Sequence, residues 1–249
     1  MEREGAGTFA ADVESLGALA DPVRMALYRY VVAQPEPVSR DQAAEAVGVR
    51  RHQARFHLDR LESDGLLATS HARLTGRSGP GAGRPSKLYR RAEREFAVTL
   101  PDRDYELAGR LLSDAVAESA RTGIPVLDAV NRSFAAYGEA AARSASGHDA
   151  PPIDAEVDAL DVAARILAAH GYEPRREGER IQLHNCPFHA LAQAQTALIC
   201  NANLCLVAAL ADEVVGQGGG QVAGQIAAGS FDARLEPAPD RCCVVLEAT

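Results

Sequence analysis

The stretch SRDQAAEAVGVRRHQARFHLDRLESDGLL, residues 39–67, carries the start and stop signals of two short helices joined by a tight turn. Ser39 followed by Gln42 is a capping-box pattern for the first helix, and Gly48 ends that helix. A second helix is expected from about residue 50 to residue 63, because apolar residues recur on one side at helical spacing: Ala54, Leu58 and Leu61. Two helices with so short a connection predict a helix-turn-helix.

A helix is predicted before this stretch and a β-hairpin after it. Residues 16–33 have apolar side chains three and four positions apart, and Pro22 after Asp21 suits a helix start. Residues 66–74 and 87–91 have the composition of two strands, and the loop between them is rich in Gly, Pro and Arg. A hairpin after the third helix forms a wing, so the N-terminal region is predicted to be a winged helix-turn-helix.

Basic charge is concentrated in the same region. The whole chain has a formal net charge of −8. Residues 40–94, however, carry 12 basic and 6 acidic side chains, whereas residues 95–249 carry 11 and 22. A local basic excess on such a fold is typical of proteins that bind double-stranded DNA. The alternative interpretation is a solvated basic helix beside a basic loop.

Seven polar side chains are the candidates for contacts with DNA. Four of them come early in the second helix of the motif, off its apolar side, where they can reach base edges in the major groove: Arg50, Arg51, Gln53 and Arg55. Three lie on or beside the wing loop, where they would meet phosphates or the minor groove: Arg77, Arg84 and Lys87.

The middle of the chain is predicted to be helical. Residues 102–121 and 124–143 show helical spacing of apolar residues, and Gly123 separates the two segments. We expect these helices to pair two subunits into a homodimer, because two wings on a pseudo-palindromic site give affinity and register that one small domain rarely supplies. Residues 144–154 have the composition of a linker.

The C-terminal region is predicted to be a small α/β module. A helix at 154–171, strands at 172–178 and 179–186, and a long helix at 187–216 with a break near Asn201 to Asn203 precede two more strands, at 232–239 and 241–248. Four short strands with these helices suggest an antiparallel sheet covered on one face. The fold class is therefore α+β, in three regions: 1–94 for the winged helix, 95–147 for dimerisation helices and 148–249 for a sensor domain.

All five cysteines lie in this last region, at positions 186, 200, 205, 242 and 243. The N-terminus lacks the basic start and apolar stretch of a signal peptide, so we expect a cytoplasmic protein without membrane association. Clustered cysteines in that reducing compartment favour metal binding over disulfides. We expect an iron–sulfur cluster held by three or more of these ligands: Cys186, Cys200 and either Cys242 or Cys243, with Cys205, His189 or an external group as the fourth.

Local geometry supports this expectation for two positions. Cys186 precedes Pro187 at a helix start, where backbone dipoles favour the thiolate. Cys242 and Cys243 open the last predicted strand, so their side chains should point to opposite faces and only one of them should join an inward site.

Two parts of the sequence resemble a known family. Residues 39–67, followed by GRPSKLYRR at 83–91, resemble the winged helix-turn-helix of the bacterial ArsR-like repressors over roughly residues 16–94. The NCPF sequence around Cys186, a cysteine fourteen positions later and a late cysteine are similar to the cluster-binding half of the Suf-operon iron–sulfur repressors. The resemblance implies a homodimeric DNA-binding repressor that senses redox or iron status.

Other interpretations of the thiols stay open. The cysteines can be small buried side chains, ligands of zinc, or a thiol–disulfide switch that uses Cys186 or the tail pair. The C-terminal domain would then respond to a small apolar or anionic molecule, or to zinc. A cysteine nucleophile with His189 as its base lacks a third orienting group, so an enzyme is not expected.

Overall fold

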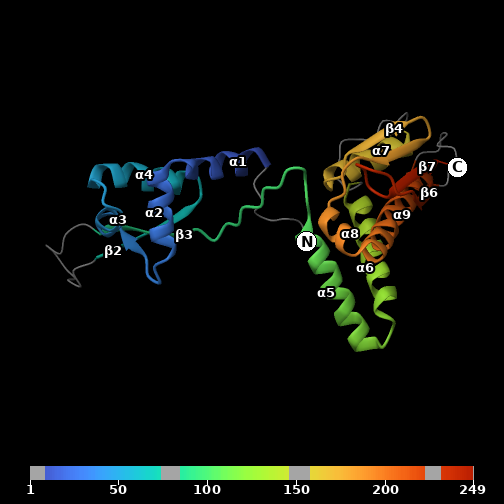
Figure 1. Ribbon diagram of the computed structural model, residues 1–249, viewed down its shortest axis with the longest axis horizontal. Coiled ribbons are helices and arrows are strands. Elements are labelled where there is room, and N and C mark those ends of the chain that lie inside the picture. The colour runs from blue at the N-terminus through green and yellow to red at the C-terminus, as the bar shows by residue number, and fades with distance from the viewer. Residues whose placement is uncertain (1–8, 74–84, 146–157, 222–230, 249) are drawn as a thin grey trace. The chain divides into compact units, whose positions relative to one another are not determined.

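The computed structural model describes residues 9–73, 85–145, 158–221 and 231–248. The chain divides into two compact units, Met1–Val98 and Thr99–Thr249 (Figure 1). We call them unit 1 and unit 2. Each unit combines helices with an antiparallel sheet, in agreement with the predicted α+β class.

Unit 1 contains the predicted helix-turn-helix and hairpin. Its elements are α1 (Phe9–Gly17), a 3-10 turn (Ala18–Ala20), α2 (Pro22–Val32), β1 (Val38–Ser39), α3 (Arg40–Val47), α4 (Arg51–Ser63), β2 (Leu67–Ala72) and β3 (Ser86–Arg91). The three strands are antiparallel in the order β1-β3-β2. The two residues of β1 were not expected as a strand; they lengthen the wing sheet by pairing with Tyr89 and Leu88.

The capping signals account for the helix boundaries. Asp21 accepts hydrogen bonds from the backbone N–H groups of Val23 and Arg24, both at 2.9 Å, and starts α2. The capping box of Ser39 and Gln42 is present. The predicted helix 16–33 is wrong in its first turn, because the cap at Asp21 begins a new helix and leaves the residues before it to α1 and the 3-10 turn.

The core of unit 1 uses the apolar side of the motif. Ala54, Leu58 and Leu61 of α4 are fully buried, as their spacing predicts, together with Leu27 of α2. Tyr89 of β3 is also buried, so the wing sheet packs onto the helices. The opposite side of α4 is thereby left to solvent.

Within the described residues, unit 2 contains three helices and four strands from the predicted sensor region, together with the two central helices. Its elements are α5 (Tyr105–Thr122), α6 (Val126–Ala145), α7 (Ala159–Ala169), β4 (Pro174–Glu177), β5 (Arg180–Leu183), α8 (His189–Ala194), α9 (Thr196–Gln221), β6 (Phe231–Leu235) and β7 (Val244–Ala248). The four strands are antiparallel in the order β4-β5-β7-β6. The predicted linker at 144–154 lies almost entirely outside the described residues.

The central helices are part of the same core as the sheet. Phe134 of α6 is fully buried in one cluster with Leu167 of α7, Leu206 of α9 and Leu246 of β7. We predicted a boundary between the central helices and the sensor domain at residues 147 and 148. The structure differs from this prediction, because the apolar face of α6 packs against α9 of the same chain. A partner subunit would meet other surfaces of these helices.

Helix α9 is the centre of unit 2. The predicted break near Asn201 is absent, and the chain instead turns at Gln195 (φ −139°, ψ 61°), between α8 and α9. Asn203 stays helical because its buried side chain has polar partners. By length and composition residues 196–216 are apolar enough to cross a membrane, and half of that stretch is buried inside the unit, as in a core helix.

Helices α6 and α9 approach each other at backbone distance. A Cβ atom added to the buried Gly138 would overlap the carbonyl oxygen of Leu206 and lie 3.1 Å from the backbone nitrogen of Leu210. Only glycine fits at this crossing, since neither neighbouring backbone can move aside independently.

We expect Gly138→Ala to destabilise unit 2 by about 2 kcal/mol or more, through overpacking between two backbones. The matched control is Gly109→Ala on the exposed side of α5, where an added Cβ meets nothing within 4 Å. That change should stabilise the helix by up to about 1 kcal/mol. Urea denaturation of the full chain measures both; a Gly138→Ala protein as stable as its parent would contradict the close crossing.

Candidate functional site

The exposed side of α4 carries the first candidate site. Arg51 and Arg55 expose 72% and 68% of their side chains, and Arg50 at the N-cap position is also exposed. Gln53 is partly buried. The four residues predicted to contact DNA therefore lie at the N-terminal end of α4. Three of them are exposed to solvent, and Gln53 is partly buried.

Carboxylates of the same unit hold two of these arginines. Arg51 forms an ion pair with Asp41 of α3, and Arg55 Nε lies 3.5 Å from Asp59 Oδ2, one turn further along α4. Exposed ion pairs of this kind contribute little to stability. Phosphate oxygens can therefore replace either carboxylate at low cost.

The three residues predicted to contact DNA from the wing differ from those of α4. Arg77 and Arg84 lie outside the described residues. The sequence predicts a phosphate contact for Lys87, whereas its Nζ lies 2.9 Å from Asp59 Oδ1 and also bonds Glu62. Lys87 is thus used inside the unit, where it ties β3 to α4.

These ion pairs shift the acid–base behaviour of the cluster. Burial opposes ionisation of Asp59, but hydrogen bonds from Lys87 and from the Tyr89 hydroxyl outweigh it and lower the pKa of the carboxyl. The same balance of burial against the bond from Lys87 lowers the pKa of Glu62. The two carboxylates in turn raise the pKa of Lys87 despite its partial burial.

An exposed aromatic residue was not among the predicted site residues. Phe56 has 66% of its surface exposed, beside a shallow groove along α4. The sequence contains the signal, because position 56 falls off the stripe of Ala54, Leu58 and Leu61, where a phenylalanine is out of pattern.

The second candidate site is the group of thiols in unit 2. All five cysteines are free. Cys200 Sγ lies 3.5 Å from Cys243 Sγ, and the thiol of Cys242 donates a hydrogen bond to Cys186. Four of the five thiols therefore form two pairs, Cys200 with Cys243 and Cys186 with Cys242. Cys205 belongs to neither pair.

Cys186 has the surroundings of a thiolate. The bond from Cys242 lowers its pKa, burial opposes this, and the backbone N–H of Phe188 and the charge of Arg103 lower it further. Arg103 also bonds the backbone oxygen of Cys186 at 3.3 Å. The direction of the shift is the one expected for a cysteine at a helix start.

Two of the other paired thiols, Cys242 and Cys200, have raised pKa values, which favour the protonated form. Donation to Cys186 and burial both raise the pKa of Cys242. Asn203 Nδ2 donates a hydrogen bond to the sulfur of Cys242 at 3.3 Å, and Asn203 Oδ1 accepts one from the Tyr172 hydroxyl. Burial, with a smaller effect of Cys243, raises the pKa of Cys200 to about 12.

The expectation that only one tail cysteine could face inward is wrong. Strand β7 begins at Val244, so Cys242 and Cys243 precede it in irregular chain, where strand alternation does not apply. Each of them reaches a different cysteine. Among the described residues, no three His, Cys, Asp or Glu side chains lie close enough together to hold a single metal ion.

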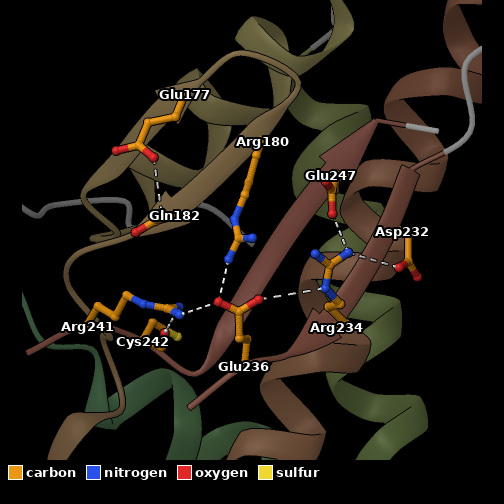
Figure 2. Close-up of polar contacts among 9 residues, drawn as sticks. All are labelled: Glu177, Arg180, Gln182, Asp232, Arg234, Glu236, Arg241, Cys242 and Glu247. Atoms are coloured by element: carbon orange, nitrogen blue, oxygen red, sulfur yellow. Dashed lines mark hydrogen bonds and ion pairs between the residues drawn. The ribbon is translucent and has the colours of Figure 1, made fainter. Parts of the chain in front are cut away.

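Backbone bonds fix both tail cysteines. The N–H of Cys242 donates to the Leu183 carbonyl at 2.8 Å, and the carbonyl of Cys243 accepts from the N–H of Glu236 at 2.6 Å. Figure 2 shows the ionic network around this segment, in which Glu236 accepts hydrogen bonds from Arg180 and from Arg241. Arg241, only 9% exposed, also bonds the Cys242 carbonyl. Residues 242 and 243 are therefore held in place by hydrogen bonds to Leu183 and to Glu236.

One comparison with known proteins bears on unit 1. Residues 19–70 match the family model described as a helix-turn-helix domain, which spans α2 to α4 and the start of the wing. No curated protein matches the chain. With the fold described above, unit 1 is a helix-turn-helix domain of the type found in DNA-binding transcription regulators.

We expect Lys87→Met to lower the free energy of unfolding by no more than about 1 kcal/mol at neutral pH, because partly exposed ion pairs are weak. The pKa values of Asp59 and Glu62 are lowered in the folded protein. Their stabilisation is therefore complete above about pH 5 and disappears as the pH falls through the lowered values. Urea denaturation from about pH 7 down to about pH 2 should show the difference from the parent shrinking to zero.

Arg90→Met on the same strand is the matched control. Its partner Glu93 is 3.5 Å away and 88% exposed, so removal of this pair should leave the pH profile of stability unchanged. Identical profiles for the two variants would show that Lys87 does not join the wing to α4.

Proposed function

We propose that the protein is a homodimeric winged helix-turn-helix repressor whose unit 2 senses redox or iron status through an iron–sulfur cluster held by cysteines. The observation that carries the proposal is the pairing of Cys200 with Cys243 and of Cys186 with Cys242, thiols that are distant along the chain, in the unit that follows the DNA-binding domain. Such a protein works on cytoplasmic DNA and needs no catalytic group.

The DNA-binding half rests on unit 1. Arg50, Arg51, Gln53 and Arg55 lie at the start of the helix that would enter the major groove, and Arg77 and Arg84 fall in the sequence between the two strands of the hairpin. A dimer would present two such helices to two half-sites, which raises both affinity and register. The local excess of basic charge supports the same conclusion.

The thiol pairs fit a metal–sulfur centre. Two thiolates on one tetrahedral metal, with bonds of about 2.3 Å, are roughly 3.7 Å apart. The Cys200 and Cys243 sulfurs, at 3.5 Å, match this edge. Four thiolates are the usual ligand set of an iron–sulfur cluster, and two pairs provide two ligands for each of two irons. Cys186, Cys242, Cys200 and Cys243 would be the ligands.

Protonation states support the same assignment. When bound, the cluster supplies a centre that gains or loses electrons and reacts with oxidants. Cys186, whose pKa is lowered, gives up its proton to a metal more readily than Cys200 and Cys242, whose pKa values are raised. Loading should therefore release protons and weaken as the pH falls.

A path for the signal runs through the chain that leaves unit 1. Val98 ends unit 1, and within the next six residues the backbone of Asp102 accepts from Asn185 at 2.8 Å and Asp104 donates to Pro187 at 3.1 Å. These bonds fasten the connecting segment to the loop that carries Cys186. A change of ligation at Cys186 would act on the segment from which the DNA-binding unit extends.

Two alternatives remain as outcomes of the test. The first is zinc, which takes four thiolates without sulfide and would require the two pairs to close around one metal ion. A repressor that responds to a small molecule, with structural cysteines, would carry neither metal.

Protein purified without oxygen should contain iron and acid-labile sulfide in equal amounts and absorb visible light. We expect Cys186→Ser to lose most of both, because it removes the ligand that is readiest to bind, and to change affinity for the operator. Cys205→Ser, outside both pairs, is the control and should keep both. Zinc without sulfide, or iron that survives in Cys186→Ser, would contradict the proposal.

Arg51→Ala should weaken binding to a duplex selected by the parent protein at least about fivefold more than binding to a random duplex, because a base contact is lost along with the charge. Arg110→Ala on α5 removes the same charge outside unit 1 and should change neither affinity. Equal losses of Arg51→Ala on both duplexes would show a contact to phosphate alone.

A further inference from the structure

Phe56 is exposed where burial would be favourable for its side chain. The ring keeps 66% of its surface in contact with solvent, while the other large apolar residues of α4, Leu58 and Leu61, are fully buried. The core of unit 1 is complete without this ring. Packing of the core therefore does not require an aromatic side chain at position 56. A ligand that covers Phe56 would gain apolar contact.

Cationic and polar side chains surround the ring. The groove beside it is lined by His52, Arg55, Phe56, Asp59, Arg60 and Ser63. The negative charge of Asp59 is already paired with Lys87 and lies near Arg55. A single ring on a basic face does not form the continuous apolar patch that binds a protein partner or a membrane. It does suit a polyanion that also carries an apolar group.

We propose that Phe56 is a specificity-determining residue that contacts the C5-methyl group of a thymine in the major groove. The proposal rests on the DNA binding proposed above and goes beyond it, since it names the base pair that α4 selects. Phenylalanine has no donor or acceptor, and the thymine methyl is the one apolar group on the base edges of the unmodified major groove. The neighbouring Arg55 would contact phosphate or guanine at the same time.

The position of the ring along α4 agrees with this role. Residues 51, 52, 55 and 56 lie toward solvent, because residues 54, 57, 58 and 61 are buried. The exposed four come from the first half of α4, and a recognition helix places its N-terminal half against base edges. Phe56 also contacts the ring of His57 edge-on, with centroids 5.3 Å apart.

The test uses the full-length protein and duplexes selected from a random pool. Each thymine of the selected site is replaced singly by deoxyuridine, which keeps every hydrogen-bonding group and removes only the methyl. For the parent protein, one thymine in each half-site should matter, with a loss of about fourfold in affinity per methyl. The other thymines serve as internal controls.

Variants then assign the effect to the ring. Phe56→Ala should bind the thymine and deoxyuridine duplexes equally, at about the affinity of the parent for deoxyuridine, whereas Phe56→Leu should keep the preference. Phe9→Ala, which removes another exposed ring of unit 1 outside α4, should behave as the parent.

Three results would overturn the proposal. The parent protein can be indifferent to every methyl, or Phe56→Ala can keep the preference. Phe56→Ala can also shift the dimer toward monomer in sedimentation, which would make the ring a subunit contact. A parent protein that selects no DNA at all would refute the proposed function itself, whereas selection without a methyl effect refutes only the role of Phe56.

Discussion

The crossing of α6 and α9 at Gly138 is the constraint on which unit 2 depends. Because no side chain separates the two backbones there, α9 is drawn into the middle of the unit, with the sheet against its other side. That position brings Cys200 and Asn203 of α9 to the segment before β7. The chemistry of the thiols thus follows from a helix packing distance, since a more distant α9 would leave its cysteine out of reach of the tail.

Much of unit 1 follows from local rules that the sequence displays openly. The capping box at Ser39 and the glycine at residue 48 act within a few residues of chain, so the boundaries of α3 could be predicted closely, whereas the cap at Asp21 was noted but the helix was predicted to begin before it. The apolar stripe of α4 identified its buried side as well. Prediction was less successful for Lys87, because its bonds to Asp59 and Glu62 join residues 25 and 28 positions away, which no local pattern reveals.

In unit 2, strands and helices were predictable, but their association was not. The sequence indicates helices at α5 and α6 without showing whether their apolar faces meet a second subunit or the same chain. The break near Asn201 was predicted from the low helix propensity of asparagine. Asn203 nevertheless stays in the helix, and its side chain bonds Tyr172 and Cys242, which come from other parts of the fold. The gathering of the thiols was anticipated in part. Their arrangement in pairs depends on the irregular chain before β7, and strand alternation gave the wrong rule for it.

Residues 242 and 243 are neighbours in the chain, and each contributes one sulfur to a different pair. A peptide unit is rigid, so displacement of one of these residues carries the other with it. The end of β5 and the first turns of α9 are consequently linked through a single dipeptide. Any ligand, oxidant or substitution that moves this dipeptide therefore displaces one sulfur of each thiol pair at the same time.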